Sequence, residues 1–458
     1  MMNLQAAARA LDEEWWGEDV RFSGVSTDSR TVARGDLFVA LTGEKFDGHD
    51  FIAEVKEKGA AAAMIQRGPG VRNREPGIPL LLVENTRLAL GQLAAHWRRR
   101  FSIPVVAVTG SNGKTTVKEM IASILRYASG EWDATGGPGK VLATEGNLNN
   151  DIGVPLTLLR LRERHEFAVI EMGMNHSGEI SYLTRLVKPG VALITNAGTA
   201  HMEELGSVEA VAGAKGEIFE GLDQHGTAVI NADDLHAPLW RRLAGTRKVM
   251  EFGLEAEPAV SARFHLDLFS SNISLLLPDG VQQVELQVPG EHNVRNAIAA
   301  AAVAVVMGVG PNAIASGLGA FRGVKGRMQR KRGLHGATVI DDTYNANPDS
   351  VRAALAVLAN GGGHKILVLG DMGELGARAR ELHESIGMEA RRAGVDTLLA
   401  LGDFSAYAAA KFGAGAQHFR KVEELVAELE GLLAPGVTLL IKGSRFMQLE
   451  RVVKSIEL

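Results

Sequence analysis

The sequence contains no cysteine among its 458 residues. Disulfide bonds, thiolate metal sites and a cysteine nucleophile are therefore excluded. An export signal is also missing, because the first residues carry Asp12, Glu13 and Glu14 and do not run from a positive charge into an apolar segment. The most apolar later stretch, residues 297–309, is alanine-rich and too short to span a bilayer. We expect a cytoplasmic protein that does not enter a membrane.

An excess of positive charge is missing as well. The formal net charge is −5, which gives no support for nucleic acid as the main partner. The hydrophobic fraction of 46% and the charged fraction of 22% are typical of a soluble globular protein. A chain of 458 residues is too long for one ordinary core, so we expect two or three domains. We also expect the chain to be a monomer.

A glycine-rich turn joins a β-branched run to a helix-like stretch at residues 105–116 (VVAVTGSNGKTT). This strand, loop and helix order is that of a P-loop, whose glycines let backbone N–H groups point at phosphates near a helix N-terminus. Lys114 would reach the β- and γ-phosphates, and the Thr115 hydroxyl would bind Mg²⁺. The full pattern asks for glycine where the chain has Val108, so an ordinary glycine turn is the alternative. The Gly-Lys-Thr context favours nucleotide binding.

Two further strands end in polar residues. The apolar run 167–170 ends in Glu171, and the run 191–194 leads through polar residues to His201. In a parallel sheet these ends lie at the same edge as the P-loop, so both side chains could meet a metal bound to the phosphates. A carboxylate is a natural Mg²⁺ ligand and histidine a less usual one, so a role for His201 is no better supported than its absence. Chemistry alone makes Lys215, in a helix-like stretch, a solvated lysine.

The rest of the chain reads as α/β structure on both sides of this region. Up to about residue 84 we expect a small α/β unit, and by composition alone its polar clusters 26–30 and 43–49 are loops. Residues 290–296 precede an alanine-rich helix and could read a base or cap that helix. The basic run 322–332 indicates a linker or domain junction. Strands in the first unit are predicted at 36–41, 60–65 and 79–83, and strands of a last, doubly wound unit at 338–340, 365–369 and 437–441.

The order of several short motifs resembles the Mur ligases, the ATP-dependent amide-forming enzymes of peptidoglycan precursor synthesis. They are 109–115 (TGSNGKT), 171–173 (EMG), 214–217 (AKGE), 292–293 (HN) and 341–348 (DDTYNANP). The resemblance covers essentially the whole chain. Its sharpest parts, 144–159 and 344–348, are similar to the member of the family that adds a dipeptide. The sibling that adds the third residue usually carries an Asp-Asn-Pro-Arg motif in its last domain, and this sequence has none.

The resemblance implies three α/β domains. Residues 1–84 would bind the UDP end of the substrate, 85–323 would form a P-loop ATPase with a mostly parallel sheet, and 324–458 a Rossmann-like domain. It implies ATP and Mg²⁺ as cofactors, with UDP-MurNAc-tripeptide and D-Ala-D-Ala as substrates. Folylpolyglutamate or cyanophycin-type ligases perform the same chemistry on other acids and are one alternative. A P-loop nucleotide switch that ligates nothing is another.

The resemblance also assigns site residues. Lys114, Glu171, His201 and Lys215 would be catalytic, and Lys215 matches a lysine that the family carries as a carbamate. Metal ligands would be Thr115, Glu171 and His201. ATP would be bound by Gly110, Ser111, Asn112, Gly113, Lys114, Thr115, Thr116, His292, Asn293, Arg327 and Asp342. Substrates would be bound by Ser29, Arg30, Asp47, His49, Thr144, Asn147, Asn149, Asn150, Asn345, Asn347, Lys442, Ser444 and Arg445.

Overall fold

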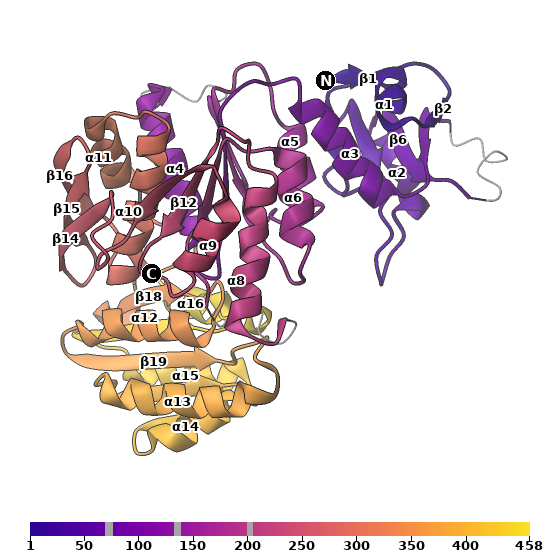
Figure 1. The fold of residues 1–458 in the computed structure, drawn as a ribbon. Helices are drawn as coiled ribbons and strands as arrows, with labels where there is room; N and C mark the ends of the chain where they lie inside the picture. The colour runs from indigo at the N-terminus through magenta and orange to yellow at the C-terminus, as the bar shows by residue number, and fades with distance from the viewer. Residues whose placement is uncertain (69–76, 132–138, 199–204) are drawn as a thin grey trace.

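A computed structural model describes residues 1–68, 77–131, 139–198 and 205–458. The chain forms three successive units, each built on a largely parallel sheet (Figure 1). In Figure 1 the N-terminal unit (indigo) lies to one side of the central unit, and the C-terminal unit (orange to yellow) lies below it. This architecture confirms the predicted α/β fold with three domains.

The N-terminal unit contains a five-stranded sheet in the order β2-β7-β6-β5-β4, with β2 antiparallel at one edge. Side chains alternate across it: Ala63 and Ile65 of β6 pack on the face of Val55 in α2, whereas Ala62 and Met64 face α1 and α3. The elements are β1 (Met2–Asn3), α1 (Leu4–Leu11), β2 (Glu14–Trp16), β3 (Arg21–Phe22), β4 (Gly24–Ser26), β5 (Asp36–Val39), η1 (Gly48–Phe51), α2 (Ile52–Glu57), β6 (Ala62–Gln66) and β7 (Leu80–Val83).

The central unit contains a six-stranded parallel sheet in the order β13-β12-β11-β8-β10-β9. Val106 and Val108 of β8 face α4 and α10, whereas Val105 and Ala107 face α3, α5 and α6, so the sheet is buried on both sides. The elements are α3 (Thr86–Arg98), β8 (Val105–Thr109), α4 (Lys114–Ala128), β9 (Val141–Ala143), α5 (Gly153–Leu159), β10 (Phe167–Glu171), α6 (Glu179–Val187), β11 (Val191–Ile194), α8 (Val208–Gly216), η4 (Glu217–Glu220), β12 (Thr227–Asn231), α9 (Ala237–Ala244) and β13 (Lys248–Phe252).

A small antiparallel sheet, β14-β15-β16, follows the central sheet, and the sequence analysis did not predict it. It covers the alanine-rich α10 and α11 with alternating apolar residues, such as Ile273 and Leu275 of β15. The small side chains of α10 let it pack closely against α4 in the same core. The elements are β14 (Ser261–Leu266), β15 (Ser271–Leu277), β16 (Gly280–Leu286), α10 (Glu291–Val306) and α11 (Pro311–Ala320).

The C-terminal unit contains a six-stranded sheet in the order β17-β18-β22-β19-β20-β21, parallel except for the edge strand β17. Helices α12, α13 and α14 cover one face and α15 and α16 the other, the two-sided arrangement of a doubly wound fold. The elements are β17 (Gln329–Arg332), η5 (Leu334–Gly336), β18 (Thr338–Asp342), α12 (Pro348–Ala359), β19 (His364–Gly370), η6 (Gly376–Arg378), α13 (Ala379–Arg392), β20 (Thr397–Leu401), α14 (Ser405–Phe412), β21 (Ala416–Phe419), α15 (Val422–Leu432), β22 (Val437–Lys442), η7 (Arg445–Met447) and α16 (Glu450–Ile456).

One predicted boundary was wrong, and one predicted junction also contains a strand. Residues 290–296 do not precede the alanine-rich helix, because α10 begins at Glu291 and so includes His292 and Asn293 in its first turn. The basic run 322–332 is not only a linker, because its last residues form the edge strand β17. Charged side chains on an edge strand contact solvent or acidic residues. A basic sequence can therefore form a strand at the edge of a sheet. Lys331 of β17 pairs with Glu457 at 2.5 Å.

Within the described residues, no helix combines the length and the apolar character that crossing a lipid bilayer requires.

Helix α11 packs on α4 most closely at Gly317, where an added Cβ would lie 2.4 Å from the Cα of Ile124. We expect Gly317→Ala to lower the free energy of unfolding by about 1–3 kcal/mol, because the methyl group overpacks this contact. Gly319→Ala is a matched control in the same helix, since the nearest atom to its Cβ would be 3.9 Å away. Urea or thermal unfolding measures both variants. Equal stability of the two would contradict the close approach.

Candidate active site

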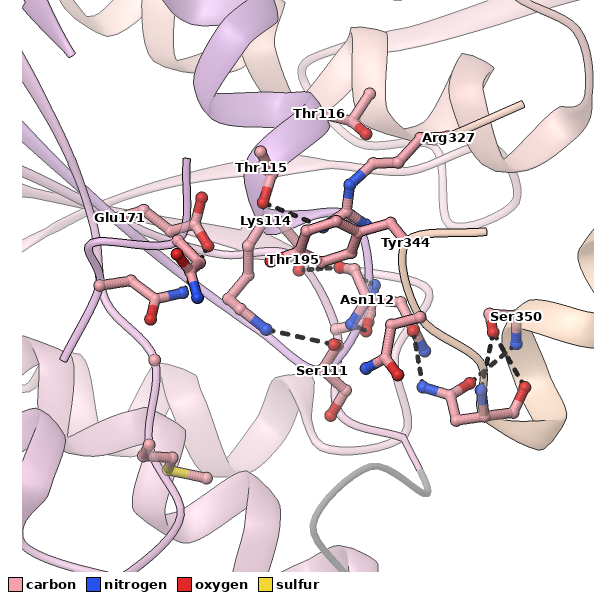
Figure 2. A pocket seen from close by; sticks show the side chains of 18 of the residues that line it. Ser111, Asn112, Lys114, Thr115, Thr116, Glu171, Thr195, Arg327, Tyr344 and Ser350 are labelled. Atoms are coloured by element: carbon pink, nitrogen blue, oxygen red, sulfur yellow. Dashed lines mark hydrogen bonds between the residues drawn. The ribbon is translucent and has the colours of Figure 1, made fainter. Parts of the chain in front are cut away.

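A cavity of about 1390 Å³ lies where the central and C-terminal units face each other (Figure 2). Its walls come from the loops at the carboxyl ends of β8, β10 and β11 in the central sheet and of β18, β19 and β22 in the C-terminal sheet. Because strands of a parallel sheet all end at one edge, two such edges bring many polar loop residues into one space. The volume is large enough for a nucleotide together with further substrate groups.

The P-loop forms one wall of the cavity. Gly113 has φ +82°, and an added Cβ would lie 2.3 Å from Oδ1 of Asn296, so the turn requires glycine here. Lys114 is the first residue of α4, and no side chain caps this helix start. The first N–H groups of a helix lack intrahelical partners and carry the positive end of the helix dipole. This end of α4 is therefore suited to bind phosphate.

The Lys114 ammonium is held back against its own loop. Its Nζ donates to the carbonyl oxygens of Gly110 at 2.7 Å and Ser111 at 3.3 Å. Burial lowers the pKa of Lys114 below its usual value, Glu171 opposes this shift, and Arg327 adds to it. A second anion beside Lys114, such as a phosphate, would compensate for this burial.

The loop after β11 holds the P-loop in place. Asn112 N–H donates to Oδ1 of Asn196 at 2.9 Å, and the hydroxyl of Thr195 donates to the carbonyl of Asn112 at 2.7 Å. Both residues line the cavity, and the sequence analysis missed both. They directly follow β11, so the rule that singled out Glu171 at the end of β10 could have found them.

The carboxylate of Glu171 lies beside Lys114 at the end of β10 (Figure 2). Glu171 is only 1% exposed, and its Oε1 accepts a bond from Nδ2 of Asn149 at 2.8 Å. Its Oε2 is buried and has no hydrogen-bond partner among the described residues. A buried, unpaired carboxylate oxygen is costly, so this atom is available for a cation.

The residues present fit a Mg²⁺ ion that shares its ligands with phosphate. Thr115 offers its hydroxyl, which here accepts a bond from Nη2 of Arg327 at 3.2 Å, and Glu171 offers the free oxygen. Within the described residues no three His, Cys, Asp or Glu side chains form a metal cluster. Mg²⁺ commonly takes one or two protein oxygens and completes its shell with phosphate and water. His201, the third predicted ligand, lies outside the described residues.

Lys215 in α8 is not the solvated lysine that its chemistry alone suggested. It is 1% exposed and makes no hydrogen bond or ion pair with another described residue. Burial, and then the positive charge of Lys114, lower the pKa of Lys215 well below its usual value. It does not line the cavity itself. A buried lysine without a carboxylate partner favours its neutral amine.

The opposite wall carries a buried ion pair. Nζ of Lys442 lies 2.6 Å from Oδ2 of Asp342, because the two residues are register partners at the ends of β22 and β18. Burial lowers the pKa of His292 nearby, an effect that Asp342 partly opposes. Arg327 stacks over the ring of Tyr344, with Cζ 4.1 Å from its centroid, and reaches across to the P-loop (Figure 2).

Several predicted substrate residues also hold the C-terminal loops together. Asn347 caps α12 and donates from Nδ2 to Oδ1 of Asn112 at 2.9 Å, which links the two units. The Ser444 hydroxyl donates to the carbonyl of Ala346 at 2.9 Å and accepts from Gly373 N–H at 2.8 Å. The polar groups of these two residues are thus already engaged within the protein.

The four predicted residues of the N-terminal unit do not line this cavity. The Arg30 guanidinium bonds to Asp28 and lowers the pKa of that carboxyl to about 2. Ring nitrogen Nδ1 of His49 lies 2.5 Å from Oδ1 of Asp47, and Nε2 accepts from Gln66 N–H at 2.9 Å. Both nitrogens of His49 are therefore used inside its own loop.

The structure brings most of the predicted residues together and leaves some apart. The predicted residues that line the cavity are Ser111, Asn112, Gly113, Lys114, Thr115, Thr116, Asn147, Asn149, Asn150, Glu171, His292, Asn293, Arg327, Asp342, Asn345, Asn347, Lys442, Ser444 and Arg445. Gly110, Thr144 and Lys215 lie outside its lining, as do Ser29, Arg30, Asp47 and His49. Lining residues that were not predicted include Asn231, Asn296, Phe252, Phe321 and Tyr344. Asn231 ends β12, a position that the strand-end rule covers, whereas Phe321 carries no sequence signal.

Three family models match the chain in order. They are the Mur ligase family catalytic domain at residues 21–98, the Mur ligase middle domain at 108–304, and the Mur ligase glutamate ligase domain at 326–445. The chain belongs to the Mur ligase family.

Particular relatives resemble it over its whole length. The UDP-N-acetylmuramoyl-tripeptide–D-alanyl-D-alanine ligase of Escherichia coli is 41% identical over 460 residues, covering 100% of this chain and 98% of the relative. A crystal structure of MurF from Acinetobacter baumannii superimposes with a TM-score of 0.90 at 38% identity, covering 99% of this chain and 98% of that one. MurF ligase from Thermotoga maritima in complex with ADP has a TM-score of 0.82 at 28% identity, covering 96% and 98%.

We expect Gly113→Ala to weaken ATP binding by about tenfold or more, since the strained backbone alone costs about 1–2 kcal/mol and the methyl collides with Asn296. Calorimetric titration of ADP measures the affinity. Gly130→Ala is the matched control beyond the other end of α4, where φ is +68° and no atom lies within 4 Å of the added Cβ. Wild-type affinity in Gly113→Ala would contradict the assignment of the phosphate site.

Proposed function

We propose that the chain is an ATP-dependent ligase that joins D-alanyl-D-alanine to UDP-N-acetylmuramoyl-tripeptide in peptidoglycan precursor synthesis. The observation that carries the proposal is one cavity containing the P-loop ammonium of Lys114, the unpaired oxygen of Glu171 and the polar loops of the C-terminal unit. The relatives named for this reaction match the chain from end to end, which supports the same substrates. We further propose a cytoplasmic monomer.

The reaction needs two bond exchanges. A terminal carboxylate oxygen of the tripeptide attacks the γ-phosphorus of ATP, the bond to the bridging oxygen breaks, and ADP leaves. The amine nitrogen of D-Ala-D-Ala then attacks the acyl carbon and loses a proton, and inorganic phosphate leaves with the original carboxylate oxygen. The carboxylate must be activated in this way because its own oxygen is a poor leaving group.

Lys114 is placed to neutralise the charge that accumulates when a carboxylate approaches a triphosphate. Its ammonium is buried beside the start of α4, where an interaction with phosphate is stronger than in water. Removing one such group from a phosphoryl-transfer site typically costs several kcal/mol of the activation barrier. Arg327 and Asp342 would contact the nucleotide from the facing unit, and His292 and Asn293 from the first turn of α10.

Mg²⁺ would be held by the Thr115 hydroxyl, the Glu171 carboxylate and His201. When bound, it supplies Lewis-acid stabilisation of the phosphate charges. Two cations beside one hydroxyl oxygen repel each other, so we expect the contact from Arg327 to Thr115 to be exchanged. Arg327 is thereby freed to contact phosphate.

We propose that Lys215 is carbamylated. The burial of Lys215 and the lowered pKa of its amine support this assignment, because only the neutral amine adds to carbon dioxide. The nitrogen–carbon bond forms as one carbon–oxygen π bond of carbon dioxide opens, the nitrogen loses one proton, and the neutral amine becomes an anionic carbamate with two oxygen ligands. Such a group would relieve the repulsion from Lys114 and could bind Mg²⁺.

The three units divide the work by position. We propose that residues 1–84 bind the UDP end through Ser29, Arg30, Asp47 and His49, that 85–323 bind ATP, and that 324–458 close the site. Thr144, Asn147, Asn149 and Asn150, with Asn345, Asn347, Lys442, Ser444 and Arg445, would position the peptide substrates. Closure would protect the acyl phosphate from water.

Release of ADP with UDP-MurNAc-tripeptide alone, with D-Ala-D-Ala alone and with both substrates tests the function. We expect rapid ADP release only with both, and ¹⁸O from the tripeptide carboxylate should appear in the phosphate. Lys114→Ala should abolish turnover while its thermal unfolding stays close to that of the wild type. ADP release that needs neither substrate would instead indicate a nucleotide switch, and phosphate without the label would refute the acyl phosphate.

For the carbamate, we expect Lys215→Ala and Lys215→Arg both to lose almost all activity, because arginine keeps a positive charge but does not form the carbamate. A crystal structure at high bicarbonate should show added density on Nζ. An active Lys215→Arg variant, together with an unmodified amine in that density, would refute the assignment.

A further inference from the structure

Lys118 is a second lysine of α4 that the reaction does not use, and it is completely buried. It lies one helical turn after Lys114 and has 0% exposure, which is rare for a charged side chain. Its Nζ donates to the carbonyl oxygen of Thr144 at 2.6 Å and to Oε1 of Glu119 at 2.6 Å. Glu119 is partly exposed, so of the two hydrogen bonds of Lys118 the one to Thr144 lies inside the protein.

Thr144 lies where strand pairing between β9 and β10 stops. The last register pair is Ala143 with Val169, and Thr144 N–H still donates to the carbonyl of Val169 at 3.0 Å. Beyond this point the edge of β10 has no strand beside it. The Thr144 hydroxyl takes over, because it accepts from the N–H of Glu171 at 2.9 Å. The chain after Thr144 turns away from the sheet, and its carbonyl is directed to Lys118 instead of to a strand.

All three polar groups of Thr144 are therefore engaged, two with β10 and one with α4. The N–H pairs with β10, the hydroxyl holds the N–H of Glu171, and the carbonyl accepts from Lys118 in α4. Thr144 is 1% exposed, so no water would replace a lost partner without rearrangement. The role proposed for Thr144 in substrate binding is therefore indirect, because it anchors the start of the loop that carries Asn147 and Asn149.

We infer that Lys118 is a positioning residue for Glu171. It holds the carbonyl of Thr144, Thr144 holds the backbone of Glu171, and the free Oε2 of Glu171 thereby points at the metal position beside Lys114. The same anchoring starts the loop that carries Asn149, whose amide orients the other carboxylate oxygen. Residues that hold a metal ligand in position through hydrogen bonds commonly have a large effect on metal affinity. This inference rests on the proposed Mg²⁺-nucleotide site.

The test measures how far Mg²⁺ strengthens binding of the ATP analogue AMP-PNP, by calorimetric titration with and without Mg²⁺. Lys118→Met removes the ammonium and keeps most of the unbranched side chain. We expect the Mg²⁺-dependent gain in affinity to fall about tenfold, while the affinity without Mg²⁺ stays within about twofold of the wild type, because the P-loop itself is unchanged. Lys454→Met, which removes an exposed lysine on α16, is the matched control and should leave both affinities unchanged.

Thr144→Val is the second variant and removes the hydroxyl that accepts from the N–H of Glu171. It tests the inference if Lys118→Met does not fold. It should show the same loss, and the double variant should be no worse than the more affected single variant, because both act through one chain of contacts. An unchanged Mg²⁺ gain in either folded variant would overturn the inference. So would an equal loss of affinity with and without Mg²⁺, since Lys118 would then merely support the helix.

The readout is separate from ligation. If the wild type fails to release ADP with both peptide substrates, the proposed function fails, while the AMP-PNP titration still judges the role of Lys118. If the wild type ligates and the variants keep the full Mg²⁺ gain, only the inference about Lys118 fails.

Discussion

The site depends on the direction in which two parallel sheets end. Every strand of the central sheet runs the same way, and the C-terminal sheet shares this property apart from β17. Each sheet therefore places all its carboxyl-terminal loops at one edge, and the fold sets these two edges against each other. Residues that are more than 200 positions apart in sequence, such as Thr115 and Arg327, meet for this reason.

Charge is distributed unevenly around the cavity. Lys114 and Arg327 bring positive charge close together, and burial lowers the pKa of Lys114 and of the nearby Lys215. On the same side Glu171 contributes a single carboxylate with one unpaired oxygen. In the proposed function, a polyphosphate with its cation would balance these charges. These fixed charges would stabilise a highly charged transition state more than they stabilise the site without substrate.

The parts that the sequence predicted are those that local pattern determines. The β8 strand, its glycine turn and the start of α4 follow from periodicity and turn chemistry, and Glu171 follows from its place at a strand end. Burial of Lys215 and Lys118 could not be predicted, because a lysine in a helix is buried only when the tertiary neighbours of that helix face are known. The sheet β14-β15-β16 was missed although Ile273 and Leu275 alternate, since the pattern is short. His201 stays a prediction.

Helix α3 shares one continuous hydrophobic core with both the N-terminal and the central sheet. Leu90 and Leu93 belong to the same cluster as Met64 of β6 and Ile170 of β10, whereas the apolar clusters of the C-terminal unit are separate. By contrast, Asn347 and Arg327 contact the P-loop through hydrogen bonds between polar groups. The hydrophobic cores therefore divide the molecule into two parts, which are the first two units together and the third unit. The first two units would move together, and the third would move relative to them while exposing little apolar surface, mainly that of Phe269, which packs against the C-terminal core.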